Sequence, residues 1–221
     1  MAFRQSSIQI GFRLPSSPHR ERPRPRLAPS TKRSRLTVDT ILQAFTGLYA
    51  QYGYDEITTT LVAERAGVSV GALYQYFPNK EAIAVALFEE TSSRVALRIR
   101  DTILEDINES LEETVAKTLA ILLSCYRENR AVLIDLLDAS PPLRAAVRHL
   151  SVVDLIERSS RIYLEQHLDE LGTGASETTR YFMGAAVKGC LRDYILNPPK
   201  NLPDETFVAE LTKILVLYAK S

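Results

Sequence analysis

The chain has little of several residue types that particular protein classes require. Two cysteines, Cys125 and Cys190, are too few for a disulfide scaffold or a zinc site, and both fall in apolar helical patterns, which predicts buried free thiols. The three histidines, His19, His149 and His167, accompany no Gly-x-Ser-x-Gly or His-Glu-x-x-His motif. We therefore expect no enzyme, no metal and no cofactor. No apolar run approaches the roughly 20 residues of a membrane helix, and the N-terminus lacks a secretory apolar segment. This predicts a cytoplasmic protein without a membrane partner.

The zero net charge conceals an uneven distribution. Residues 1–36 hold nine basic residues and one acid, a balance of +8, so the other 185 residues hold 18 basic and 26 acidic groups, a balance of −8. The first 36 residues also have five prolines and no periodicity, which predicts a disordered basic arm. Such an arm suits a polyanion, as homeodomain arms do in a minor groove. The alternatives are a solvated tail or an over-called start codon.

The stretch 58–80 predicts two short helices joined by a tight turn. Thr58 offers an N-cap oxygen to the first helix, and Gly67 stands where a helix ends in a left-handed residue. Ser69 then caps a second helix over residues 70–76. Two short helices around a glycine-containing turn make a helix-turn-helix, whose second helix fits a DNA major groove.

The same stretch resembles the DNA-binding domain of TetR-family transcriptional regulators. The resemblance lies in Gly67-Val68-Ser69, Gly71, Leu73-Tyr74, Tyr76-Phe77 and Asn79-Lys80-Glu81, and with the preceding helix it covers about Thr37 to Leu87. It implies a helix-turn-helix domain over residues 37–87 and a helical effector-binding and dimerisation domain over 88–221. It further implies a regulator, commonly a repressor, that binds a near-palindromic operator as a homodimer. A small hydrophobic effector would release it. We expect the last two helices to form the dimer interface; the alternative is that their apolar faces complete a core within one chain.

Helical periodicity continues to the C-terminus, and no alternating strand pattern interrupts it. The first helix should bury a stripe of Ile41, Leu42, Phe45, Leu48, Tyr49 and Tyr52. The prediction is an all-α fold of about nine helices. Outside 58–76, seven further helices are expected: Val38–Tyr52, one that Asn79 caps and that runs to Leu104, Leu111–Arg127, one that Asn129 caps and that runs to Leu137, Leu143–Leu168 with Pro141-Pro142 at its start and a break near Ser151, Glu177–Leu196 and Asp204–Ala219.

The predicted DNA-contacting residues are Thr58, Thr59, Thr60, Ser69, Val70, Gly71, Ala72, Tyr74, Gln75, Tyr76 and Lys80. The apolar groups of Val70 and Ala72 can meet thymine methyls, whereas Thr60 and Gln75 can read bases by hydrogen bonds. The resemblance assigns phosphate contacts to Thr59, Tyr74, Tyr76 and Lys80. For the two tyrosines, packing against the first helix is the alternative.

A ligand pocket is implied by the resemblance alone. The predicted lining residues are Leu119, Leu122, Cys125, Tyr126, Leu133, Leu137, Tyr163, Phe182, Met183 and Val187, each of which has plain core packing as its alternative. Two other functions stay open. One is a helical ligand-binding or protein-interaction module without DNA binding, and the other is a small enzyme that uses Asp138 or Glu165 as acid or base.

Overall fold

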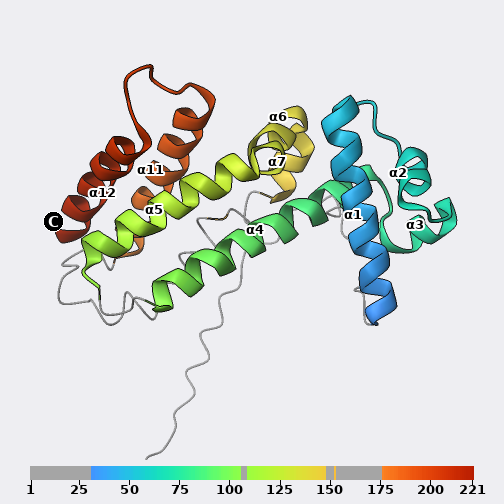
Figure 1. The fold of residues 1–221 in the computed structure, drawn as a ribbon, viewed down its shortest axis with the longest axis horizontal. Coiled ribbons are helices and arrows are strands. Elements are labelled where there is room, and N and C mark those ends of the chain that lie inside the picture. Colours follow the sequence, from blue (N-terminus) through green and yellow to red (C-terminus); the bar gives the residue numbers. More distant parts are fainter. Residues whose placement is uncertain (1–30, 106–108, 148–151, 153–175) are drawn as a thin grey trace, which may run out of the picture.

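The computed structural model describes residues 31–105, 109–147, 152 and 176–221, and within these ranges the fold is all-α (Figure 1). The helices are α1 (Lys32–Tyr52), α2 (Thr59–Ala66), α3 (Val70–Tyr76), α4 (Lys80–Glu105), α5 (Leu111–Glu128), the π-helix η1 (Ala131–Asp135), α6 (Leu136–Ala139), α7 (Pro141–Val147), α11 (Glu177–Leu196) and α12 (Asp204–Lys220). None of these helices is long and apolar enough to cross a lipid bilayer.

Helices α1, α2 and α3 form a head at one end of the molecule (Figure 1). The predicted local signals are confirmed there. The Thr58 side chain accepts a hydrogen bond from the Leu61 amide at 3.2 Å, and the Ser69 side chain accepts one from the Ala72 amide at 3.1 Å. Gly67 ends α2 in the left-handed region, with φ 66°. The three helices share a core that includes the fully buried Phe45 and Leu73.

The N-terminus of α1 differs from the prediction. The helix begins at Lys32, six residues before Val38, because Thr31 and Ser34 form a capping box in which each side chain bonds to the other's backbone. The predicted disordered arm over 1–36 is therefore wrong for residues 32–36, and residues 1–30 lie outside the described ranges. Tyr52, predicted on the buried stripe, is 51% exposed. It stands in the last turn, just before Gly53 ends the helix with φ 75°.

Helix α4 connects the head to the rest of the molecule. Asn79 caps it as predicted, because its side-chain oxygen accepts a hydrogen bond from the Ala82 amide at 2.8 Å. Over 26 residues α4 contacts α1 in the head and α5, α7 and η1 in the body. Its buried face includes Ile83, Phe88 and Ile99. One continuous hydrophobic core thus runs from the head into the body.

The segment after α5 departs from the prediction. Asn129 does not cap a following helix with its side chain. Instead its amide group donates a hydrogen bond back to the Cys125 carbonyl at 2.8 Å, so Asn129 closes α5. The chain continues into the π-helix η1, whose Val132, Leu133 and Ile134 are buried, and then into α6. Of the predicted helix 143–168, the structure describes only residues 143–147 and Val152. The predicted break at Ser151 lies outside the described ranges.

Two polar junctions fix the body helices to one another. The Tyr194 hydroxyl of α11 lies 2.7 Å from Asp204 Oδ1 of α12, and Arg127 of α5 donates to the same carboxylate at 2.8 Å. In the second junction, the Asp138 carboxylate of α6 accepts from Arg144 of α7 at 2.8 Å and from Arg192 of α11 at 2.6 Å. Each junction ties α11 to another part of the body.

Candidate DNA-binding surface

The predicted DNA-contacting residues lie together on α2, on α3 and at the start of α4, at the outer end of the head (Figure 1). The exposed members are Thr58, Thr60, Ser69, Val70, Gly71, Tyr74 and Gln75, and the half-buried ones are Thr59, Ala72, Tyr76 and Lys80. The inner face of α3 is held by Leu73, which is fully buried. The outer face, with Val70 38% exposed and Tyr74 40% exposed, is open to a partner.

Thr59 and Tyr74 are brought together by the packing of α2 against α3. Their hydroxyl oxygens lie 3.0 Å apart, although the residues are 15 positions apart in sequence. The bond positions two hydroxyl groups at one point of the surface, where both remain accessible. Because a hydroxyl can donate and accept at once, the pair can hold its mutual bond and still donate to a phosphate oxygen.

Tyr76 lies in a different environment from Tyr74. It is half-buried and packs against the hydrophobic core of the head. The packing alternative raised for the two tyrosines therefore suits Tyr76 better than Tyr74. This difference between the two tyrosines follows from helical geometry, since residues two positions apart on a helix point in different directions.

The Lys80 ammonium group has protein partners that the sequence did not reveal. It donates hydrogen bonds to the carbonyl oxygens of Tyr54 at 3.0 Å and Asp55 at 3.2 Å, and it lies 4.6 Å from the centre of the Tyr54 ring. These contacts tie the first residue of α4 to the loop between α1 and α2. An ammonium has three N–H donors, so one remains for a phosphate.

Tyr54 itself is a buried member of this cluster. Burial, with a smaller contribution from the nearby Glu81 carboxylate, raises the pKa of Tyr54 to about 12. No sequence signal pointed to Tyr54 or to its contact with Lys80, because the two residues are 26 positions apart and meet only in the folded head.

Some exposed residues of the head were absent from the prediction. Leu61 is 39% exposed and directly follows Thr60 on α2. The next two residues, Val62 and Ala63, are buried, so Leu61 lies on the opposite face of α2. This place in the helical pattern could have identified it as exposed. The first turn of α1 carries exposed Lys32, Arg33 and Arg35 and no acidic residue. The sequence predicts these three cations as part of the disordered arm, whereas they lie in the first turn of α1.

The predicted ligand-lining residues divide into three groups. The buried ones are Leu119, Leu122, Cys125, Leu133 and Val187, and the half-buried ones are Tyr126, Leu137 and Met183. Phe182 is 55% exposed, so it lines no pocket formed by the described residues, and Tyr163 lies outside them. On α11, Val187 faces inward, Met183 is only half-buried and Phe182 points to solvent.

The two cysteines also differ from each other. Burial raises the pKa of the Cys125 thiol, although the Arg98 guanidinium, whose Nη1 lies 3.6 Å from the sulfur, acts in the opposite direction. Cys190 is exposed on α11, so the prediction of two buried thiols is wrong for Cys190. Its helix presents that position to solvent.

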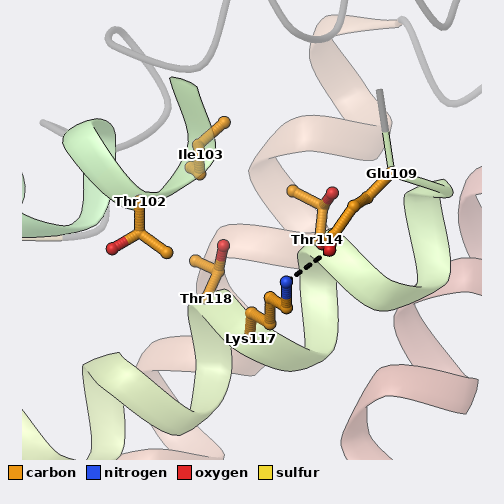
Figure 2. Close-up of a pocket in the computed structure, with 6 residues that line it drawn as sticks. All are labelled: Thr102, Ile103, Glu109, Thr114, Lys117 and Thr118. Carbon is orange, nitrogen blue, oxygen red and sulfur yellow. Dashed lines mark hydrogen bonds and ion pairs between the residues drawn. The ribbon is translucent and has the colours of Figure 1, made fainter. Parts of the chain in front are cut away.

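Figure 2 shows a small polar pocket where the end of α4 meets the beginning of α5. Its empty volume is about 170 Å³ including open solvent, and it is lined by Thr102, Ile103, Glu109, Thr114, Lys117 and Thr118. Lys117 and Glu109 form an ion pair across it. None of the predicted lining residues belongs to this pocket, and its volume is below the roughly 300–1,000 Å³ of typical small-molecule sites. It is therefore not the predicted effector site.

Comparison with known proteins identifies the head. Residues 41–87 match the family model of bacterial regulatory proteins of the tetR family. A curated relative, the fatty acid metabolism regulator protein of Bacillus subtilis (strain 168), is 30% identical over 135 residues, which are 61% of this chain and 59% of the relative. The match thus spans less than two thirds of that relative's length.

Solved structures extend the likeness in fold beyond the head. FadR from Bacillus subtilis in complex with stearoyl-CoA has a TM-score of 0.58 and 22% identity, covering 82% of this chain and 97% of that one. Thermus thermophilus FadR in complex with lauroyl-CoA has a TM-score of 0.56 and 22% identity, covering 81% and 93%. The helix-turn-helix head, its family match and the all-α body agree with one another. Residues 41–87 thus match the tetR-family model of bacterial regulatory proteins, and the body shares the all-α fold of the solved FadR structures.

Proposed function

We propose that this chain is a transcriptional repressor that works in the cytoplasm. It binds a near-palindromic DNA operator as a homodimer and is released by a long-chain acyl-CoA thioester. The observation that carries the DNA-binding part is the exposed α2–α3 surface, with the Thr59–Tyr74 hydroxyl pair at 3.0 Å, inside the segment that matches the family model. Phosphate contacts from this pair and from Lys80 would fix the register of α3 in the major groove.

Base readout falls to the outer side of α3. Val70 and Ala72 have no side-chain hydrogen-bond donor, so they suit the methyl groups of thymines, whereas Gln75 can pair with adenine. Replacing the facing thymines with uracil removes only the methyl group. We expect this replacement to weaken binding, and unchanged affinity would contradict the apolar readout.

The homodimer is supported by the apolar residues that α11 and α12 leave exposed. Tyr181 and Phe182 on α11 are 70% and 55% exposed, and Ile214 and Leu217 on α12 are 59% and 71% exposed. Large apolar groups gathered on two adjacent helices suit a protein–protein interface better than water. A four-helix bundle of α11 and α12 with their copies would cover them. Two-fold symmetry then presents two copies of α3, which requires a near-palindromic operator.

The proposed effector class rests on the relatives and on the chemistry of the body. The two solved FadR structures hold lauroyl-CoA and stearoyl-CoA, and the curated relative is a fatty acid metabolism regulator. In this chain the predicted lining residues Leu119, Leu122 and Leu133 are apolar and buried, which suits an acyl chain. To cause release, the effector must bind the conformation without DNA more tightly than the DNA-bound one.

A titration of labelled DNA tests the proposal. The probe is a duplex from the region upstream of the chain's own gene, followed by fluorescence anisotropy with excess competitor DNA. We expect specific binding that stearoyl-CoA or lauroyl-CoA reverses and that free coenzyme A does not. Failure to prefer the upstream duplex over competitor would contradict DNA regulation and favour a helical module without DNA binding. Specific binding that no acyl-CoA changes would contradict only the effector class.

A further inference from the structure

The glycines of the head differ in what the fold requires of them. Gly53 and Gly67 have φ of 75° and 66°, which other residues rarely adopt. At Gly47 an added Cβ would lie 3.1 Å from the Arg65 guanidinium, so this glycine makes room for a side chain that crosses α1. The fold of the protein itself therefore explains why glycine stands at each of these three positions.

Nothing in the described structure requires a glycine at position 71. Its φ is not positive, and a Cβ built on it would meet no heavy atom within 4 Å. Glycine also weakens a helix relative to alanine, because it loses more backbone freedom when it is ordered. The cost falls on α3, which has only 7 residues. For the isolated protein, alanine at this position would be the better residue.

The surface around Gly71 indicates where the reason lies. Its neighbour Val70 is 38% exposed and Tyr74, one turn later, is 40% exposed with its hydroxyl bonded to Thr59. Gly71 thus stands in the middle of the outer face of α3, on the side that the Thr59–Tyr74 pair marks. On the helix, Gly71 lies between the directions of Tyr74 and Gln75, which are exposed one turn later, so a partner that touches both must pass over Gly71.

We propose that Gly71 is the point of closest approach between α3 and the base edges, and is therefore a specificity-determining residue. This inference rests on the proposed DNA binding. Without a Cβ, the α3 backbone at Gly71 can lie against the groove floor, which brings Val70 and Ala72 within reach of thymine methyls. A side chain at this position would hold the helix away from the bases. Phosphate contacts made by flexible side chains at the edges of the surface would suffer less.

A graded substitution series tests this steric role. Gly71→Ala and Gly71→Leu are compared with the wild type for melting temperature without DNA, for affinity to the upstream duplex and for affinity to a scrambled duplex. We expect Gly71→Ala to melt at the same temperature or roughly 2–4 °C higher. Its affinity for the upstream duplex should fall by about tenfold or more, as for the loss of a good base contact, and Gly71→Leu should lose more. Affinity for the scrambled duplex should change by less than about twofold, because phosphate contacts dominate there.

Gly67→Ala is the matched control, since it should lower the melting temperature through its positive φ. Unchanged affinity of Gly71→Ala and Gly71→Leu for the upstream duplex would overturn the inference while leaving the proposed function intact. Equal losses on both duplexes would also overturn it. A wild type that fails to distinguish the duplexes would overturn the proposed function and this inference together.

Discussion

The Tyr74 hydroxyl oxygen lies 3.0 Å from Thr59 Oγ1, so one hydrogen bond joins the two short helices of the head at their exposed surface. Val62 of α2 and Leu73 of α3, both fully buried, belong to the core on the inner side of the same two helices. The bond and the core together fix the angle between α2 and α3. The two hydroxyls are therefore held together as one unit on the surface that we propose contacts phosphate.

Removing either hydroxyl should weaken DNA binding without unfolding the head. For Tyr74→Phe and Thr59→Val we expect a loss of about 1 kcal/mol in binding free energy each, the usual value of one hydrogen bond. The double variant should lose less than the sum, because the first change already breaks the shared bond. Anisotropy titrations of the four proteins measure this coupling. Strictly additive losses would show that the two hydroxyls act independently.

Lys80→Met should affect both folding and DNA binding. The carbonyl groups of Tyr54 and Asp55 lose a charged donor, so the free energy of unfolding should fall by about 1–2 kcal/mol. Affinity for all duplexes should fall about equally, and the slope of affinity against salt concentration should fall by roughly one. Chemical denaturation and a salt titration measure the two effects. An unchanged salt slope would restrict Lys80 to holding the loop between α1 and α2.

Leu217→Glu should prevent dimerisation. Leu217 is 71% exposed on α12, so an isolated chain loses little stability, whereas burying a carboxylate in an apolar interface is costly. The matched control is Leu97→Glu, at a leucine that is 48% exposed on α4. Light scattering across a range of concentrations should report a dimer for the control and a monomer for Leu217→Glu. Equal masses for the two variants would place the interface elsewhere.

Tyr54→Phe should alter stability at alkaline pH. Burial raises the pKa of Tyr54 from 10.0 to about 12, so the full contribution of the neutral phenol is present below pH 10.0. Between these values the unfolded chain releases its proton first, and the free energy of unfolding falls by about 2–3 kcal/mol. Tyr54→Phe has no phenol to ionise, so its free energy of unfolding should not show this part of the fall with pH. Denaturation at pH 9 and about pH 11.5 measures it, and an identical decline in both proteins would contradict the assignment.

Tyr54→Phe also removes a buried hydroxyl that lies near the Ser140 hydroxyl and the Glu81 carboxylate but makes no hydrogen bond of full geometry with the described residues. Near neutral pH the variant should therefore be as stable as the wild type, or more stable by up to about 1 kcal/mol. A large loss of stability at neutral pH would show that the hydroxyl has a partner.

Local signals explain how much of the head could be predicted. Caps such as Thr58, Ser69 and Asn79 satisfy amides only three residues away, and Gly67 is selected by its own φ. These features depend on a few neighbouring residues, so the sequence contains them in full. The bounds of α11, Glu177–Leu196, agreed for the same reason, because Ser176 caps its first turn.

Features that depend on residues distant in sequence were missed. The Lys80 contacts with the loop after α1 need the folded head. The π-helix at Ala131–Asp135 has no cap of its own, and its buried residues pack against the body core. Phe182 was predicted to line a pocket that only the resemblance implied, and a resemblance does not show which face of α11 other residues cover. The start of α1 was missed because its capping box uses Ser34 where glutamate or glutamine is usual.

The Asp138 carboxylate has one property that an ordinary ion pair lacks, since guanidinium groups from two different helices share it. If α11 moves away from α6, Arg192 leaves but Arg144 still neutralises the charge. If α7 moves instead, Arg192 remains. Because the Asp138 side chain is also 35% exposed, water would solvate it even without either guanidinium, so breaking one of these ion pairs should cost little. A change in the position of α7 or α11 would thus leave α6 attached to the other of these two helices.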